Sequence, residues 1–158
     1  MSVYCETITN TESRESASKR LVVLEPTLKS LLLCNNVYVD DYGLNTYEGE
    51  FKTIHVSSIP AVKKELYVVT KWGDGQGPGL KQEIKIICPE NSLEIFSSLE
   101  LENEFELKNI YHEHVVTGRI SDLLLPRAGR YRVEIYLSGQ MKAKTHLNVV
   151  LSSTPAPL

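Results

Sequence analysis

The triplet His112-Glu113-His114 comes closest, by residue type and spacing, to a metal site. On a strand, His112 and His114 point to the same face, and two imidazoles on one face can bind a transition metal. A cupin-type site also needs a Glu four or five residues after the second His, but Gly118 and Arg119 occupy those positions. The triplet therefore favours surface or half-buried histidines, and a metal-dependent enzyme using His112 and His114 is the alternative.

A glycine-rich segment, Gly73–Gly79, follows the single tryptophan, Trp72, and offers a second candidate site. An indole beside a loop can stack on a sugar or anchor a peptide, and Asp74 and Gln76 add polar groups. The segment lacks both the Gly-Lys-Ser/Thr of a phosphate-binding loop and the third glycine of a dinucleotide motif. We therefore expect a hairpin connection with Trp72 packed at the core edge. A carbohydrate or small-ligand site at Trp72, Asp74 and Gln76 is the alternative.

Four carboxylates gather in one short stretch of the chain, Asp40–Glu50. Asp40 and Asp41 precede a glycine and suit a turn, because Asp side chains accept hydrogen bonds from turn amides. Glu48 and Glu50 are two residues apart and share the wet face of the next predicted strand. The pattern favours a turn and a solvated face over an acid/base pair or a calcium site.

The clearest structural element is a hairpin over residues 128–149, in which apolar and polar residues alternate on both arms. This period of two places one set of side chains in a core and the other in water. Ser138-Gly139-Gln140 supplies the tight turn. The inward set comprises Tyr131, Val133, Ile135 and Leu137, then Met141, Ala143, Thr145, Leu147 and Val149. The outward set predicts a basic stripe of Arg130, Arg132, Lys142, Lys144 and His146, which we interpret as a solvated face.

The remaining chain predicts more short strands separated by turn residues. We expect them over residues 28–39, 45–57, 66–72, 80–88 and 109–120, with two short strands within 92–107. Eight to nine short strands without a long helix indicate an all-β protein. The predicted fold is an antiparallel β-sandwich, immunoglobulin-like or jelly-roll-like. The predicted boundaries are a flexible segment over 1–24, the sandwich over 25–151 and a flexible tail over 152–158.

Composition narrows the range of partners. A net charge of −3, with the 17 Lys and Arg spread along the chain, argues against nucleic acid as the main partner. The longest apolar run, Leu31–Cys34, is far shorter than the ~20 residues needed to cross a bilayer, so we expect no membrane association. The number of cysteines is odd, and none of the three, Cys5, Cys34 and Cys88, has a partner at CxxC spacing. This pattern is typical of buried thiols in a reducing compartment. With no secretory signal pattern, these features predict a cytoplasmic protein.

Two parts of the sequence resemble a bacterial family of uncharacterised small β-sandwich proteins. The first runs from Leu31 through Phe51 and on to the corner Ser58–Val62, and the second is Leu124–Tyr131. The resemblance covers about residues 29–149. It implies the sandwich fold and carries no catalytic activity with it.

The sequence therefore predicts a non-enzymatic protein-interaction or accessory module that needs no cofactor. Its expected partner is another protein or a second copy of the chain, because strand edges and loop tips support association. A small-ligand or carbohydrate-binding sandwich and a metal-dependent enzyme stay open as alternatives.

Overall fold

A computed structural model describes residues 24–97 and 104–152 of the 158-residue chain. These residues form eleven strands: β1 (Thr27–Cys34), β2 (Asn36–Val39), β3 (Asn45–Glu48), β4 (Thr53–Val56), β5 (Ala61–Gly73), β6 (Gly77–Ile87), β7 (Glu94–Ser97), β8 (Glu104–Leu107), β9 (His114–Leu125), β10 (Gly129–Leu137) and β11 (Gln140–Leu151). Among the described residues, no helix is long and apolar enough to cross a membrane.

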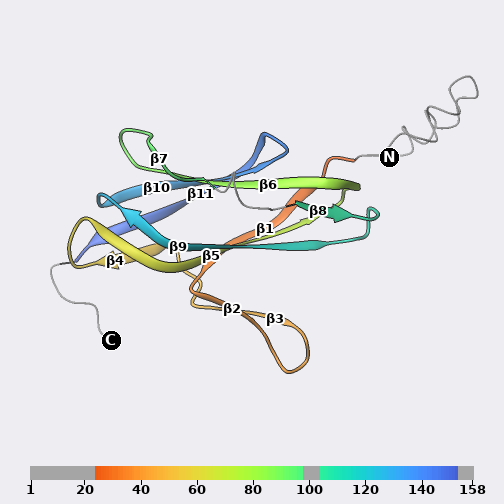
Figure 1. The fold of residues 1–158 in the computed structure, drawn as a ribbon, viewed down its shortest axis with the longest axis horizontal. Coiled ribbons are helices and arrows are strands. Elements are labelled where there is room, and N and C mark those ends of the chain that lie inside the picture. Colours follow the sequence, from red (N-terminus) through yellow and green to blue (C-terminus); the bar gives the residue numbers. More distant parts are fainter. Residues whose placement is uncertain (1–23, 98–103, 153–158) are drawn as a thin grey trace, which may run out of the picture.

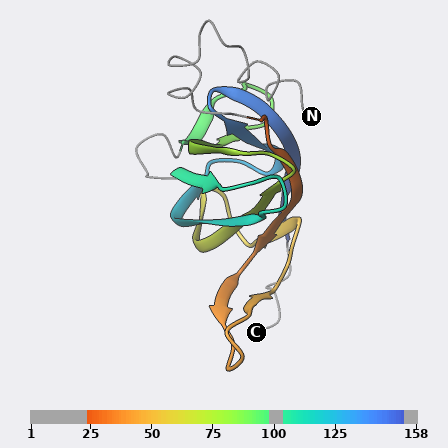
Figure 2. The ribbon, with the colours of Figure 1, turned by 90° about the vertical axis from the view of Figure 1, so that its right-hand side faces the viewer.

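Two sheets stack face to face and confirm the β-sandwich (Figures 1 and 2). One layer has the order β1-β5-β9, and the other has the order β4-β11-β10-β6-β7, with β8 also paired to β6. All named strand pairs are antiparallel except β4 with β11, which is parallel. Taking β1, β5, β6, β9, β10 and β11 as strands A, B, C, E, F and G gives the A-B-E and C-F-G layers of an immunoglobulin-like sandwich.

A buried tyrosine fixes the corner between the two layers. Tyr131 lies at the start of β10, is fully buried, and donates a hydrogen bond of 2.7 Å from its hydroxyl to the carbonyl of Arg127. The Arg127 backbone N–H donates back to the same hydroxyl at 3.2 Å. This is the tyrosine corner of immunoglobulin-like sandwiches, in the strand where that fold places it.

The predicted hairpin over 128–149 is confirmed as β10 and β11, joined by a two-residue turn at Ser138-Gly139. Both turn residues have positive φ (49° and 88°), the conformation that a tight hairpin requires. The predicted inward residues of β10 are buried, and in β11 Leu147 and Val149 are buried while Met141 is exposed. The inward–outward alternation of β11 is interrupted before Met141, because a bulge opposite Ile135 and Tyr136 shifts the register of the two strands.

Two expected strands are each divided in two, which raises the number from eight or nine to eleven. The stretch 28–39 changes partners after Cys34, since β1 pairs with β5 whereas β2 pairs with β3. The stretch 45–57 breaks at Gly49, where φ is +69°. Periodicity alone did not reveal either break, because each half keeps a strand-like pattern.

The glycine-rich segment 73–79 was expected to be a hairpin connection, but β5 and β6 belong to different sheets, so it links the two layers instead. β5 extends to Gly73 and β6 begins at Gly77, so the connection is only Asp74–Gln76. Gly75 lies against another part of the backbone, where an added Cβ would come within 2.5 Å of the Pro26 Cα. Glycine is therefore required there for close backbone contact, not for mobility.

Candidate functional site

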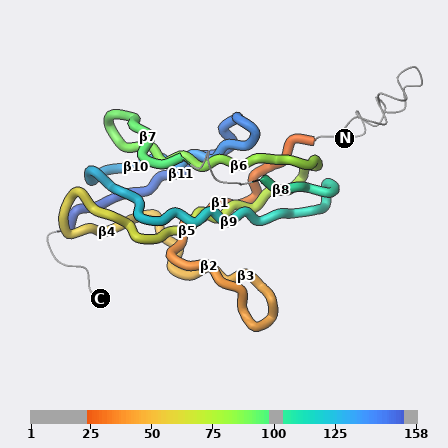
Figure 3. Tube along the Cα trace, viewed as in Figure 1, coloured from red at the N-terminus to blue at the C-terminus, as the bar shows by residue number. Residues whose placement is uncertain are grey.

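The β2–β3 hairpin projects away from the two layers, as all three views of the chain show (Figures 1, 2 and 3). It follows β1 and precedes β4 in the chain and forms a separate two-stranded sheet. Its residue pairs run from Asn36↔Glu48 to Val39↔Asn45. Isolated two-stranded hairpins are marginally stable, because nothing covers their apolar side chains. This hairpin is therefore a projecting element whose own contacts must hold its shape.

The two faces of the hairpin differ in polarity. Because directly paired residues share a face, Val37, Tyr47 and Val39 lie on one face, and Tyr38 lies on the other with Thr46. Val39 is 64% exposed, and both Tyr38 and Tyr47 are also exposed. On the apolar face Val39 and Tyr47 are exposed and Val37 is half-buried, and exposed apolar side chains that lie together are typical of surfaces that another molecule covers.

Hydrogen bonds to Asp40 fix the tip. Its Oδ1 accepts hydrogen bonds from the backbone N–H groups of Tyr42 (2.8 Å) and Leu44 (2.9 Å). Its backbone N–H donates to the Leu44 carbonyl, and its carbonyl accepts from the N–H of Gly43. The tip thus presents two outward side chains, Tyr42 at 89% exposure and Leu44 at 64%. The predicted turn-forming role of Asp40 is confirmed, but the outward Tyr42 and Leu44 were not predicted as a site.

The base of the hairpin is held to the sandwich. The Asn35 backbone N–H lies within hydrogen-bonding distance of the Glu48 and Gly49 carbonyls, at 3.0 and 3.2 Å. Its side-chain oxygen accepts a hydrogen bond of 2.7 Å from Lys63 Nζ, and Lys63 also lies over the Phe51 ring. Gly49 packs so closely on Asn35 that an added Cβ would lie 2.7 Å from its Nδ2. The hairpin is consequently fixed at both ends.

The charges within the hairpin segment itself are all negative, whereas Lys63 of β5 adds a positive charge at its base. Residues 36–51 contain four carboxylates and neither Lys nor Arg. Asn36 donates a side-chain hydrogen bond of 3.3 Å to Glu48, and Glu48 and Glu50 are both exposed. The hairpin therefore combines exposed apolar and tyrosine side chains with an acidic surround.

The predicted ligand site at Trp72, Asp74 and Gln76 does not form one surface. Trp72 is fully buried and donates from Nε1 to Gln82 Oε1 at 2.7 Å, so no ring face is free to stack on a sugar. Asp74 pairs with Lys29 at 2.7 Å. Gln76 exchanges two backbone hydrogen bonds with Leu24. The burial of Trp72 confirms the expected packing on the core and argues against the alternative of a stacking platform.

The two predicted histidines do lie together, with ring centroids 6.1 Å apart. His112 precedes β9 and accepts a hydrogen bond at Nδ1 from the Lys108 backbone N–H. His114 stacks on the Phe105 ring at 5.2 Å. Burial, and then the neighbouring His112, lower the pKa of His114. Both are half-buried, and no group of three His, Cys, Asp or Glu side chains suited to a metal occurs within 24–97 and 104–152.

The carboxylate of Glu134 lies among the residues of the predicted basic stripe on β10 and β11 and interrupts its positive charge. Glu134 is buried between Arg132 Nε (2.5 Å) and the Tyr136 hydroxyl (2.8 Å), and it lies opposite Lys144 across the strand pair. Burial opposes its ionisation, but the bonds from Arg132 and Tyr136 outweigh burial, and the pKa of Glu134 is lowered. The expected continuous stripe is thus a mixed-charge surface. Lys142 turns away from it and pairs with Glu25.

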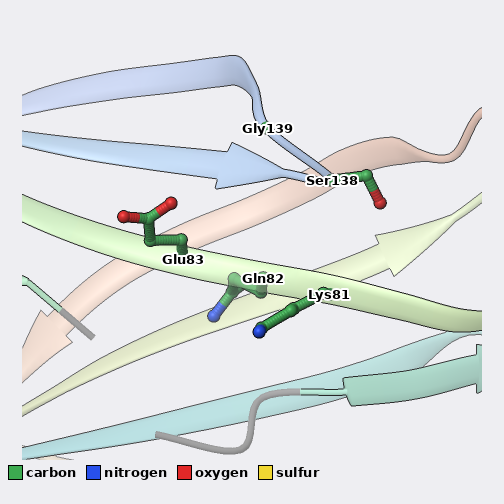
Figure 4. A pocket seen from close by; sticks show the side chains of 5 residues that line it. All are labelled: Lys81, Gln82, Glu83, Ser138 and Gly139. Carbon is green, nitrogen blue, oxygen red and sulfur yellow. The ribbon is translucent and has the colours of Figure 1, made fainter. Parts of the chain in front are cut away.

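Two concave regions flank the Ser138-Gly139 turn. The smaller, about 210 Å³, is lined by Lys81, Gln82 and Glu83 of β6 and by the turn itself (Figure 4). The larger, about 370 Å³, is lined by Glu25, Pro26, Leu80, Leu137, Ser138, Gln140 and Lys142. Sequence reasoning missed both, because they join residues that are distant in the chain.

Comparison with known proteins gives a family but no activity. Residues 29–150 match a family of unknown function (DUF6941). No curated protein matches the chain. β-Glucosidase 3B from Thermotoga neapolitana, solved with glucose, is 22% identical, with a TM-score of 0.42 over 72% of this chain, and the chain spans 18% of that enzyme's length. An immunoglobulin-like protein from Pseudomonas aeruginosa is 9% identical, with a TM-score of 0.37 over 80% of this chain and 97% of its own.

The family match covers most of the sandwich, including the hairpin, and its extent agrees with the resemblance to uncharacterised β-sandwich proteins over about residues 29–149. The chain therefore belongs to the family of unknown function DUF6941.

Proposed function

We propose that this chain is a non-enzymatic protein-interaction module whose contact element is the β2–β3 hairpin. The observation that carries the proposal is the tip, where Tyr42 and Leu44 stand in water on a turn held by Asp40. Tyrosine is enriched at protein interfaces because it adds contact area at low cost in conformational entropy. A tip that is ordered before binding further reduces this cost.

The charge of the hairpin specifies the partner's chemistry. Two hairpins placed face to face would bring eight carboxylates together, four from each copy, and like charges oppose such contact. The fitting partner is instead another protein whose surface has an apolar groove bordered by Lys and Arg. Electrostatic attraction would speed the encounter, and burial of Tyr42 and Leu44 would supply most of the affinity.

We also propose that the protein works in the cytoplasm. Cys34 and Cys88 are both buried, free thiols, which supports a reducing compartment.

The proposal is tested by capture from a lysate of the native host on three immobilised proteins: wild type, Tyr42→Ala/Leu44→Ala, and Tyr111→Ala. Tyr111 is 87% exposed and lies outside the hairpin, so it is a matched control. The wild type and the control should retain the same discrete protein, and the double variant should lose about 2 kcal/mol of binding, roughly thirtyfold in affinity. Equal retention by all three proteins would reject the hairpin as the contact element.

A further inference from the structure

The larger concave region beside the Ser138-Gly139 turn has the features of a small-molecule site. Its volume of about 370 Å³ falls within the range of ligand pockets. It is lined by residues of the β10–β11 turn, and that turn lies on the side of the sandwich opposite the projecting hairpin (Figures 1 and 2). It is therefore separate from the proposed interaction element.

A bulge directs a lysine into this cavity. Ile135 pairs with Ala143 and Tyr136 pairs with Met141, so Lys142 is the extra residue of β11. Bulges redirect side chains and are enriched next to functional sites. The Lys142 side chain is only 19% exposed, whereas its neighbour Lys144 is exposed. Most of this side chain is shielded from water, and its ammonium has a negative partner.

That partner is Glu25, which comes from outside both sheets. Its side chain is 61% exposed, although it forms an ion pair with Lys142. Ion pairs with an exposed member contribute little, because water solvates the carboxylate almost as well. A carboxylate from another molecule can therefore replace Glu25 at little cost.

The rest of the lining is suited to a short apolar tail with a polar end. Leu80 and Leu137 are core side chains that reach the cavity, and Pro26 adds a third apolar surface. Ser138 and Gln140 also line the cavity, and both residue types carry hydrogen-bonding side chains.

We propose that this cavity binds a small organic acid with a short apolar tail, its carboxylate paired with Lys142 in place of Glu25. The tail lies over Leu80, Leu137 and Pro26. Nothing in this site depends on the hairpin, so the two proposals succeed or fail separately.

The test is a titration of the full chain with sodium hexanoate, followed by ¹H–¹⁵N NMR. Hexanoate should give saturable shifts at the amides of Leu80, Ser138 and Gln140, with a dissociation constant on the order of 1 mM for a ligand of so few atoms. Hexanamide, which has the same tail but no charge, should bind at least about tenfold more weakly.

Three variants make the test decisive. Lys142→Met should lose at least about tenfold in affinity for hexanoate, whereas Lys81→Met, which removes a lysine from the neighbouring cavity, should bind as the wild type does. Glu25→Gln should bind more tightly, because it removes the competing carboxylate, and this gain cannot result from misfolding. Wild-type affinity in Lys142→Met, weaker binding in Glu25→Gln, equal binding of hexanamide, or absence of saturable shifts in the wild type would each overturn the proposal.

Discussion

Replacing Asp40 with Ala should loosen the hairpin tip while leaving the sandwich intact. The change removes two hydrogen bonds, those from the Tyr42 and Leu44 backbone N–H groups to Oδ1. Each exposed bond of this kind contributes roughly 0.5–1 kcal/mol, so the tip should lose about 1–2 kcal/mol of local stability. The backbone bonds between Asp40 and residues Gly43 and Leu44 stay, so the turn should open more often without disappearing.

Hydrogen exchange measures this opening directly. A loss of about 1–2 kcal/mol should speed exchange of the Tyr42 and Leu44 amides by roughly five- to thirtyfold, with the midpoint of thermal unfolding unchanged. Asp41→Ala removes the same charge from the next residue, which is exposed, and should leave both rates near the wild-type values. Equal acceleration in both variants, or none in Asp40→Ala, would refute the idea that Asp40 orders the tip before binding.

Other predictions concern the sandwich. Tyr131→Phe removes the bonds to the Arg127 backbone and should lower the free energy of unfolding by about 1–3 kcal/mol in a urea titration, and an unchanged midpoint would contradict the corner's role. The pKa of Glu134 is lowered in the fold, so its stabilising effect is present above the unfolded value of about 4.5 and is lost as pH falls through the folded value. The melting temperature of Glu134→Gln should accordingly lie below that of the wild type at neutral pH and approach it in acid. A gap of constant size would argue against this titration. Because Trp72 is fully buried, a panel of sugars should leave its fluorescence unchanged, and a saturable shift would contradict the buried position.

Local sequence patterns predicted the parts of the fold that depend on alternation. The β10–β11 hairpin is the clearest case, since the inward residues of β10 and the Ser138-Gly139 turn follow from period two and positive φ, although Met141 of β11 lies beyond a bulge and is exposed. Burial of Trp72 was also predictable, because a single Trp at a strand end usually covers the core. The division of 28–39 into β1 and β2 was not, because a change of pairing partner leaves no mark on the period of the chain.

The candidate sites were harder to predict for a related reason. Tyr42, Leu44 and Val39 look like ordinary turn and strand residues, and only the three-dimensional arrangement shows that no other part of the described chain covers them. Strict alternation predicted that Lys142 is a solvated outward residue. The bulge in β11 changes its direction, and Lys142 lines a cavity instead. Conversely, His112 and His114 do lie close together, as their spacing predicted, but no third ligand from the described residues joins them.

The most direct test of the central claim is photo-crosslinking in the native host. A photoreactive phenylalanine derivative replaces Tyr42 in one protein and Tyr111 in another, since both side chains are highly exposed and only Tyr42 lies on the hairpin. We expect one discrete crosslinked protein from position 42, with Lys and Arg around the crosslinked site, and none from position 111. The same products from both positions, or none from position 42, would contradict the hairpin as the site of interaction.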